Sequence, residues 1–222
     1  MREIVLDTET TGLDPGSGHR VVEIGCLELI NHIPSGEAFH TYVNPERDMP
    51  AGAFEIHGLS DEFLADKPRF GDVADGLLAF VGESVLVIHN ALFDLGFLNA
   101  EFARIGRAPL PEARAIDTVG LARRRFPGAP ANLDALCRRF GIDNAARTKH
   151  GALLDAELLA EVYLELIGGR QPSLGLGSAR EVATESREER PARAPRRHEP
   201  DAEESAAHAA FVRKLKNPVW QG

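Results

Sequence analysis

The sequence has few cysteines, and this scarcity limits the classes of protein that it can represent. Only Cys26 and Cys137 occur among 222 residues, so a disulfide framework is excluded. Cys26 lies in a strand-like run and Cys137 in a helix-like run, and we expect both to be small core side chains rather than metal ligands. The first residues also lack the long apolar segment of a signal peptide. Together these absences predict a reducing, cytoplasmic setting.

Long apolar runs and an excess of positive charge are also absent. Runs such as residues 85–88 are far too short to cross a membrane, so we expect no membrane association. Residues 1–169 contain 15 Lys and Arg against 26 Asp and Glu, a net charge of −11, and residues 170–222 contain 10 against 8, a net charge of +2. The front part therefore lacks the broad basic surface of a duplex DNA-binding protein. A nucleic-acid enzyme is still compatible with this charge, because metal ions supply positive charge at a reacting phosphate.

The first dozen residues carry the clearest chemical signal. The run Ile4-Val5-Leu6 predicts a buried strand, and because side chains alternate along a strand, Asp7 and Glu9 leave its end on one face. Two carboxylates that converge away from water repel each other unless one takes up a proton or a cation lies between them. Hard divalent ions such as Mg²⁺ prefer oxygen ligands of this kind. Taken alone, however, an Asp-x-Glu pair is more common in an ordinary turn.

The rest of residues 1–169 alternates between strand-like and helix-like patterns. We expect strands at residues 21–30, 38–43, 84–89 and 115–118, with a turn at residues 31–36. Helices are expected to begin at residues 60–62 and to cover residues 70–80, 95–102, 119–125 and 133–140 and the segment from about 151 to 167. Residues 49–59 show no regular period and predict an ordered surface loop, in which His57 has a structural or a ligand-contacting role.

Three further residues become informative only in combination. Asp94 follows the buried strand at residues 84–89, and a helix N-cap would explain it if it stood alone. Asp155 lies in a helix that begins near His150, and an exposed His before a helical Asp is also ordinary. With Asp7 and Glu9, however, all of these lie beside apolar elements that would bury them. Such carboxylates could bind two divalent ions about 4 Å apart, which stabilise the attacking and the leaving oxygen when a phosphoryl group is displaced. A neutral His can accept the proton of the attacking water near neutral pH.

Three segments resemble the motifs of the DEDD exonucleases, in the subtype with a His in the last motif. They are Asp7-Thr8-Glu9-Thr10-Thr11-Gly12, His89-Asn90-Ala91-Leu92-Phe93-Asp94 and His150-Gly151-Ala152-Leu153-Leu154-Asp155. The resemblance covers residues 3 to about 168 and extends to the proofreading epsilon subunits of bacterial DNA polymerase III through residues 126–128 and 133–137. It implies an α/β, ribonuclease-H-like exonuclease fold, in which helices flank a mixed central sheet.

The same resemblance implies an activity and the residues that carry it. The activity is a 3′→5′ exonuclease that removes mispaired 3′-terminal nucleotides from DNA as 5′-monophosphates. Two Mg²⁺ or Mn²⁺ ions would be held by Asp7, Glu9, Asp94 and Asp155, with His150 as the general base. The terminal nucleotide of a single-stranded or frayed DNA end would be bound by Asp7, Glu9, Thr10, His57, Asn90 and Asp155. Two alternatives stay open: an exoribonuclease of the same superfamily, and a non-catalytic module that supports a polymerase.

The C-terminal part differs in composition from the front domain. Residues 170–200 are rich in Arg, Glu, Ala and Pro, and we expect a flexible linker that follows an exonuclease domain at residues 1–169. Within it, Gln171–Leu176 resembles a sliding-clamp-binding peptide. Asp201 and Glu204 predict a capping box that opens a helix with Ala207, Phe211 and Leu215 on one face, followed by Trp220. So short a helix implies a partner surface, or docking on its own domain. The resemblance implies that residues 201–222 bind an alpha-type subunit of DNA polymerase III.

Overall fold

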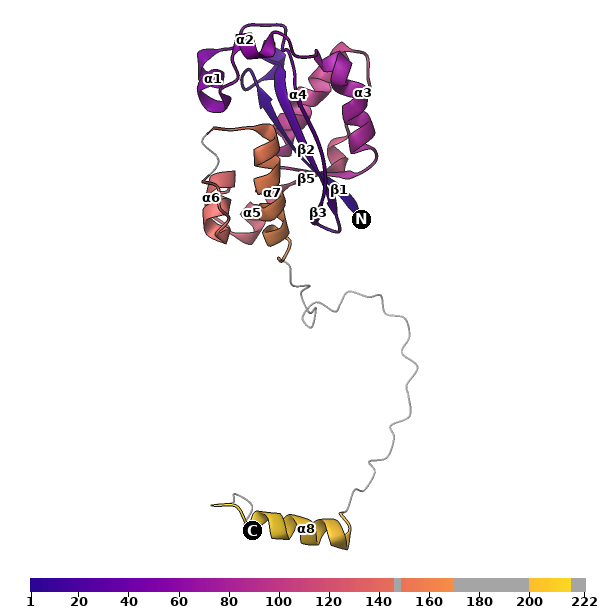
Figure 1. The fold of residues 1–222 in the computed structure, drawn as a ribbon, viewed down its shortest axis with the longest axis vertical. Helices are drawn as coiled ribbons and strands as arrows, with labels where there is room; N and C mark the ends of the chain where they lie inside the picture. Colours follow the sequence, from indigo (N-terminus) through magenta and orange to yellow (C-terminus); the bar gives the residue numbers. More distant parts are fainter. Residues whose placement is uncertain (146–148, 170–199, 217–222) are drawn as a thin grey trace. The chain divides into compact units, whose positions relative to one another are not determined.

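The front part of the chain is built around a five-stranded mixed sheet (Figure 1). The computed structural model describes residues 1–145, 149–169 and 200–216, and it divides into two units, Met1–Leu174 and Gly175–Gly222. The strand order is β3-β2-β1-β4-β5, in which β1 to β3 are antiparallel neighbours and β4 and β5 run parallel to β1. The strands are β1 (Arg2–Thr10), β2 (Val21–Ile30), β3 (Ile33–Tyr42), β4 (Val85–Ile88) and β5 (Ala115–Asp117).

Helices cover both faces of the sheet. Along β1, Ile4 and Leu6 face one layer and Val5 faces the other, so the period-2 alternation of this strand serves two apolar cores. The first core lies under α3 and α4, and the second lies under α5, α6 and α7 (Figure 1). The helices of this unit are α1 (Ala51–His57), α2 (Asp61–Leu64), α3 (Phe70–Val81), α4 (Ala91–Arg104), α5 (Thr118–Arg125), α6 (Leu133–Phe140) and α7 (Ala152–Leu166), with short 3₁₀ turns η1 (Pro15–Ser17) and η2 (Glu112–Arg114).

This architecture confirms the predicted fold class and most of the predicted elements. The strand predicted at residues 21–30 has the observed bounds, and so does the helix at residues 133–140, which Gly141 ends in the left-handed conformation. Cys26 and Cys137 are both buried core side chains, as expected. The boundaries predicted for the domain and linker stay predictions. Among the described residues, no helix is both long enough and apolar enough to span a membrane.

The turn predicted at residues 31–36 is wrong. The hairpin turns on two residues, Asn31 and His32, with φ of +51° and +68°, and β3 begins directly after them. Positive φ at both positions matches the twist of the flanking strands. Pro34 and Gly36 are residue types common in turns, but β3 is an edge strand, where proline costs no ladder hydrogen bond on the open side.

The loop predicted at residues 49–59 is also wrong, because residues 51–57 form helix α1. This helix buries only Ala53 and His57, so it leaves no apolar period that a seven-residue window could reveal. Gly58 ends the helix with φ of +76°, and its N–H donates to the carbonyl of Phe54.

The described residues of the second unit, 200–216, include helix α8 (Ala202–Val212). The predicted capping box is confirmed, since Asp201 Oδ1 accepts the Glu204 N–H at 2.8 Å and Glu204 Oε2 accepts the Asp201 N–H at 3.1 Å. The helix ends before Leu215, so the prediction that Leu215 extends its apolar face is wrong. None of the residues of α8 is buried, and Phe211 is 60% exposed. Gln171–Leu176 and Trp220 lie outside the described residues.

The start of α7 lies against the backbone of β2 at Gly25. A Cβ atom placed on Gly25 would lie 2.4 Å from the backbone of Ala152 and of Leu153. Gly25 pairs with Asp7 on β1, so it occupies the same stretch of the sheet as the predicted site. Because a strand residue without a side chain permits close approach of another backbone, Gly25 sets how near the first turn of α7 comes to the sheet.

We expect Gly25→Ala to lower the free energy of unfolding by about 1–3 kcal/mol, because the added methyl group must displace backbone atoms. Urea unfolding of the purified chain measures this change. Gly96→Ala is the matched control: Gly96 is exposed in α4, nothing lies within 4 Å of its added Cβ, and alanine there stabilises a helix by up to about 1 kcal/mol. Equal stability of the two variants would contradict the close contact.

Candidate active site

Asp94 is hydrogen-bonded to Thr8, the residue of β1 between Asp7 and Glu9. Its Oδ1 accepts the Thr8 N–H at 3.0 Å and the Thr8 hydroxyl at 2.7 Å. Thr8 separates Asp7 from Glu9, so these two hydrogen bonds join the start of α4 to the end of β1. Asn90, with φ of +69°, is the N-cap residue of α4, and the alternative explanation of Asp94 as the N-cap is therefore excluded.

The buried carboxyl group of Asp94 does not ionise freely. Asp94 is 3% exposed, and burial raises the pKa of its carboxyl group to about 7. The hydrogen bonds from Thr8 lower this pKa, but their effect is smaller than that of burial. Its place in the first turn of α4 favours negative charge, although the helix dipole does not cancel the cost of burial. A cation bound beside Asp94 would offset the remaining free-energy cost of burying its charged carboxylate.

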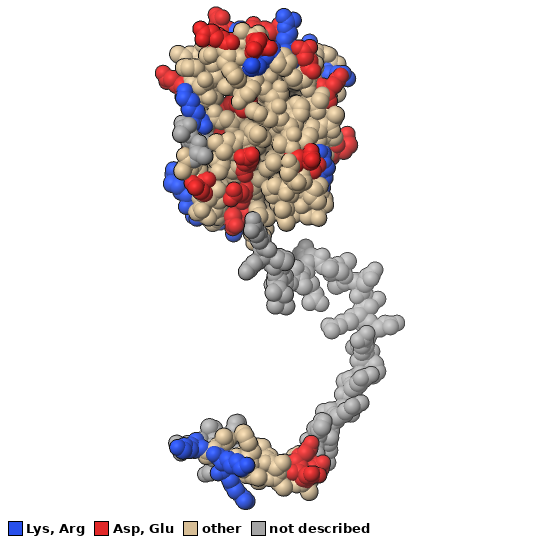
Figure 2. Space-filling view, in the orientation of Figure 1, with Lys and Arg blue, Asp and Glu red and all other residues tan. Residues whose placement is uncertain are grey.

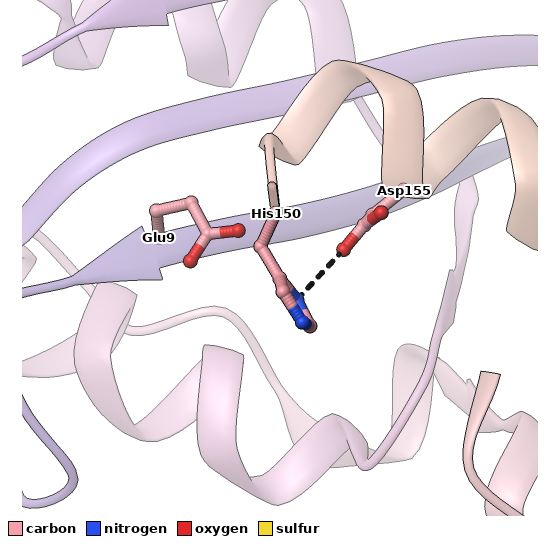
Figure 3. A group of neighbouring side chains, drawn as sticks. All are labelled: Glu9, His150 and Asp155. Carbon is pink, nitrogen blue, oxygen red and sulfur yellow. Dashed lines mark ion pairs between the residues drawn. The ribbon is translucent and has the colours of Figure 1, made fainter. Parts of the chain in front are cut away.

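Glu9, His150 and Asp155 meet on the α7 side of the sheet (Figure 3). One ligand atom from each of the three lies within 4.8 Å of the others. His150 Nδ1 is 3.3 Å from Asp155 Oδ2, and Figure 3 shows His150 between Glu9, at the end of a strand, and Asp155, on the helix. The carboxyl groups of Glu9 and Asp155 are buried, whereas the His150 ring is 47% exposed.

Helix α1 supports the segment that carries His150. The His150 N–H donates to the carbonyl of Ile56 at 3.2 Å, and Lys149 Nζ lies 3.4 Å from the carbonyl oxygen of Phe54. Lys149 Nζ also lies 5.0 Å from the centre of the Phe54 ring, within the range of a cation–π contact. The position of His150 therefore depends on the C-terminal half of α1, which the sequence pattern had not revealed as a helix.

All five residues predicted for catalysis line one cavity of about 280 Å³. Asp7, which is partly buried, and Asp94 line this cavity without belonging to the tighter group of Glu9, His150 and Asp155. We refer to this space as the carboxylate cavity; its lining residues are Asp7, Thr8, Glu9, His89, Phe93, Asp94, Asn132, Leu133, Asp134, His150 and Asp155.

The sequence analysis assigned no role in the site to four polar residues of this lining: Thr8, His89, Asn132 and Asp134. His89 Nδ1 lies 2.8 Å from the Thr118 hydroxyl, which fixes the ring against the start of α5. Asn132 caps α6, its Oδ1 accepting the Ala135 N–H at 2.8 Å. A polar residue directly before an apolar helical pattern predicts a cap, and that signal gives no indication that the cap also faces a cavity.

A second, larger cavity of about 590 Å³ adjoins the carboxylate cavity, and the two share Thr8, Glu9 and Phe93. Thr10 and His57, for which substrate binding was predicted, line it with Gly12, Ile56 and other residues of the first loop and of α1. We refer to it as the larger cavity. Asn90, which was also predicted to bind substrate, is exposed and lines neither cavity.

His57 is a neutral hydrogen-bond donor that faces the larger cavity. The Leu59 N–H donates to His57 Nδ1 at 3.0 Å, so the proton of the neutral ring is on Nε2. Burial lowers the pKa of His57, which favours this neutral form. His57 Nε2 is buried and forms no hydrogen bond of normal geometry within the described parts of the chain, although the Thr10 backbone interacts with the ring and partly opposes the effect of burial on its pKa. A polar group of a ligand in the cavity would satisfy it.

The donor set of the carboxylate cavity fits divalent cations. The cavity is lined by five carboxyl groups, those of Asp7, Glu9, Asp94, Asp134 and Asp155, and by the imidazoles of His89 and His150. One ligand atom each of Glu9, His150 and Asp155 already lies within 4.8 Å of the others. Mg²⁺ and Mn²⁺ prefer carboxylate oxygen. Because Asp94 resists ionisation without a counter-charge, the same cavity has an electrostatic reason to bind a cation.

The chain is similar to known exonucleases and polymerase subunits. The exonuclease (RNase_T) family model matches residues 4–163. DNA polymerase III subunit epsilon of Rickettsia felis is 59% identical over 174 residues, which cover 77% of this chain and 76% of that protein. The subunit of the same name from Pasteurella multocida is 41% identical in an alignment 237 residues long, gaps included, which covers 99% of this chain and 93% of that protein.

A solved structure supports the fold. Exonuclease X in complex with 5′ overhanging duplex DNA has a TM-score of 0.60 and 27% identity, covering 74% of this chain and 90% of that chain. The ribonuclease-H-like exonuclease fold and the resemblance to exonucleases are therefore confirmed.

We expect Asp94→Asn to raise the free energy of unfolding in metal-free buffer at pH 8, on the order of 2–4 kcal/mol. In the wild type the folded pKa of Asp94, about 7, lies above the unfolded value of about 3.9, so this group makes stability fall as pH rises between the two values. The amide keeps the Oδ1 acceptor for Thr8 without a charge.

Urea unfolding with a chelator at pH 5 and pH 8 checks this expectation. The stability difference between variant and wild type should be larger at pH 8. Asp75→Asn, at an exposed position of α3, serves as the control and should show little difference at either pH. A variant less stable than the wild type at pH 8 would contradict the raised pKa.

Proposed function

The chain belongs to the exonuclease family, and we propose that it is the proofreading 3′→5′ exonuclease subunit of a bacterial DNA polymerase III. The observation that carries this proposal is the convergence of Asp7, Glu9, Asp94, His150 and Asp155 on one cavity, beside a second cavity that can hold a nucleoside. The chain is similar to epsilon subunits over most of its length, which supports a function in DNA replication.

The 3′-terminal nucleotide would occupy the two adjoining cavities. The larger cavity has mainly apolar walls, including Ile56 and Phe93, and would hold the terminal base and sugar. His57 Nε2 would donate a hydrogen bond to a polar group of this nucleoside. The carboxylate cavity, which shares Thr8 and Glu9 with it, would hold the scissile phosphate. Binding of DNA by Exonuclease X, a structural relative, agrees with a nucleic-acid substrate.

The reaction is metal-dependent hydrolysis of the terminal phosphodiester. Asp7, Glu9, Asp94 and Asp155 would hold two Mg²⁺ or Mn²⁺ ions, which when bound lower the pKa of water and stabilise the leaving oxygen. His150 would remove a proton from the attacking water, with Asp155 Oδ2 orienting its ring at 3.3 Å. Its exposure allows the proton to pass to solvent. The phosphorus–O3′ bond breaks, giving a 5′-monophosphate and a new 3′-hydroxyl.

Selectivity for errors requires no sequence readout. A mispaired end unstacks at lower cost than a paired one, so it reaches the cavities more often. An exoribonuclease is the alternative that shares this site chemistry. A non-catalytic module is disfavoured, because a chain without activity has no need to bring five such residues to one cavity.

The C-terminal unit would bind the alpha-type polymerase subunit through residues 201–222. None of the side chains of helix α8 is buried and Phe211 is exposed, as expected of a helix that binds another protein. Similarity to the Pasteurella multocida subunit extends over 99% of this chain, so it includes this unit. Gln171–Leu176 would engage the sliding clamp, and the cytoplasm is the compartment that this assembly implies.

We expect Asp7→Ala to abolish digestion of single-stranded DNA ends and His150→Ala to lower the rate by roughly 10²–10⁴. Asp7 would be a metal ligand, whereas His150 would act on the proton of water. End-labelled DNA and RNA, matched and mismatched, incubated with Mg²⁺ and then with chelator, measure the activity and the preference between substrates. Loss of metal binding in His150→Ala would make His150 a ligand instead, and full turnover in chelator would refute the proposed mechanism.

We expect Trp220→Ala to weaken binding to the polymerase subunit without changing exonuclease activity, because the residue lies in the C-terminal segment and outside the exonuclease domain. Surface plasmon resonance with immobilised polymerase subunit measures the affinity, and digestion of a single-stranded end measures the activity. An equal loss of both would contradict separate roles for the two parts.

A further inference from the structure

Five exposed arginines lie at the C-terminal ends of α5 and α6, in a domain that is otherwise acidic. Residues 123–139 contain five arginines against one acidic residue, Asp134, although residues 1–169 carry a net charge of −11. Figure 2 shows Lys and Arg atoms at the lower left edge of the domain, where Figure 1 draws α5 and α6. We refer to the five as the arginine patch: Arg123, Arg124, Arg125, Arg138 and Arg139.

Two aromatic rings hold part of this patch in place. The Phe126 and Phe140 rings lie 5.9 Å apart, and thereby join the ends of α5 and α6. The Arg139 guanidinium lies 4.5 Å from the centre of the Phe126 ring, and the Arg125 guanidinium lies 5.5 Å from the same centre. Arginines that stack on rings lose less side-chain entropy when they bind an anion, and a guanidinium stays charged at any physiological pH.

The charges of the patch are not neutralised by the domain itself. Among the ion pairs within residues 1–145, 149–169 and 200–216, none involves the five arginines, although the Arg125 guanidinium donates a hydrogen bond to the carbonyl of Glu165. By contrast, Arg2, Arg69 and Arg107 each face a carboxylate, at Glu28, Glu46 and Asp75 respectively. The helix dipole favours a cation in the last turn of a helix by about 0.3–1 kcal/mol. That effect explains single arginines, but it does not explain five unneutralised charges gathered on an acidic domain.

Both helices lead from the carboxylate cavity to the patch. Asn132, Leu133 and Asp134, at the start of α6, line the carboxylate cavity, and Thr118 begins α5 in contact with His89 of the same lining. The arginines follow Thr118 and Asn132 by five to seven residues, which at 1.5 Å per helical residue places them roughly 8–11 Å along the helices from that wall. The start of α6 lines the carboxylate cavity alone and not the larger cavity, so a strand that leaves the larger cavity passes the carboxylates before it reaches α6.

We propose that the arginine patch binds backbone phosphates of the strand being digested, a few nucleotides on the 5′ side of the scissile bond. This proposal rests on the proposed function, since it takes the 3′ end to occupy the larger cavity. The patch gives an acidic domain a local hold on a polyanion. Guanidinium groups bind phosphate without reading sequence, as a proofreading enzyme requires.

The test compares substrates of different length. The variant Arg123→Gln/Arg124→Gln/Arg138→Gln removes three charges and leaves both stacked arginines in place. The substrates are the p-nitrophenyl ester of thymidine 5′-monophosphate, a dinucleotide and a series of single-stranded DNA oligonucleotides up to a dodecamer. We expect the KM of the wild type to fall as length rises to about six nucleotides, and the KM of the variant to stay about tenfold higher for the dodecamer.

Activity on the small ester, and kcat on every substrate, should be unchanged in the variant. The dependence of log kcat/KM on log salt concentration should become less steep by about 2, because three fewer arginines release counterions from a single strand. The variant Arg123→Lys/Arg124→Lys/Arg138→Lys retains the charges and should recover most of the length dependence.

The matched control is Arg69→Gln/Arg104→Gln/Arg107→Gln, which removes the same charge from exposed positions at α3, at α4 and just after α4, on the other face of the sheet. It should keep the wild-type length dependence. If the patch variant also keeps it, the patch does not bind the strand and the proposal is wrong. A patch variant that loses activity on the ester acts through the fold, which also overturns the proposal. A wild type that cleaves none of the substrates refutes the proposed function itself.

Discussion

The contact between the first turn of α7 and the bare backbone of β2 at Gly25 sets the geometry of the candidate site. Gly25 lies opposite Asp7, and the absence of a side chain there lets the backbone of Ala152 approach the sheet. One helical turn later, Asp155 comes within reach of Glu9. On the other face, Asp94 is joined to Thr8 by two hydrogen bonds. Two helices from different layers thus deliver carboxyl groups to the end of one strand.

The sequence predicts those parts of the site that follow from strong local rules. Alternation along β1 places Asp7 and Glu9 on one face, and the buried strand at residues 85–88 brings Asp94 to the same edge of the sheet. Helix α1 escaped prediction because its seven residues bury only two side chains, so no periodicity could develop. The roles of His89 and Asn132 escaped as well, since each satisfies a local rule for a strand end or a cap while it faces the cavity. Their second role depends on tertiary packing.

Charge is arranged so that one acidic domain can handle a polyanion. The carboxylate cavity concentrates negative charge where the reaction needs cations, and the remaining acidic surface would repel a strand that approached elsewhere. Unneutralised arginines at the ends of α5 and α6 break this pattern on one flank. The electrostatic field of the domain and the position of the cavity then favour the same path for the strand, along the arginine patch and into the carboxylate cavity.

The support of His150 by α1 divides the site into parts of unequal rigidity. The carboxylates extend from the central strand and from helices that pack on the two apolar cores. The backbone of His150 is instead held by a hydrogen bond to Ile56 of a helix with two buried side chains, and its exposed ring contacts Asp155. Segments with so few apolar contacts open at much lower free energy than the core does. A brief opening of α1 would displace the imidazole and leave the acidic residues where they are. Catalysis can thus pause and resume without any global unfolding, and warming or mild denaturant should silence turnover well before the sheet melts.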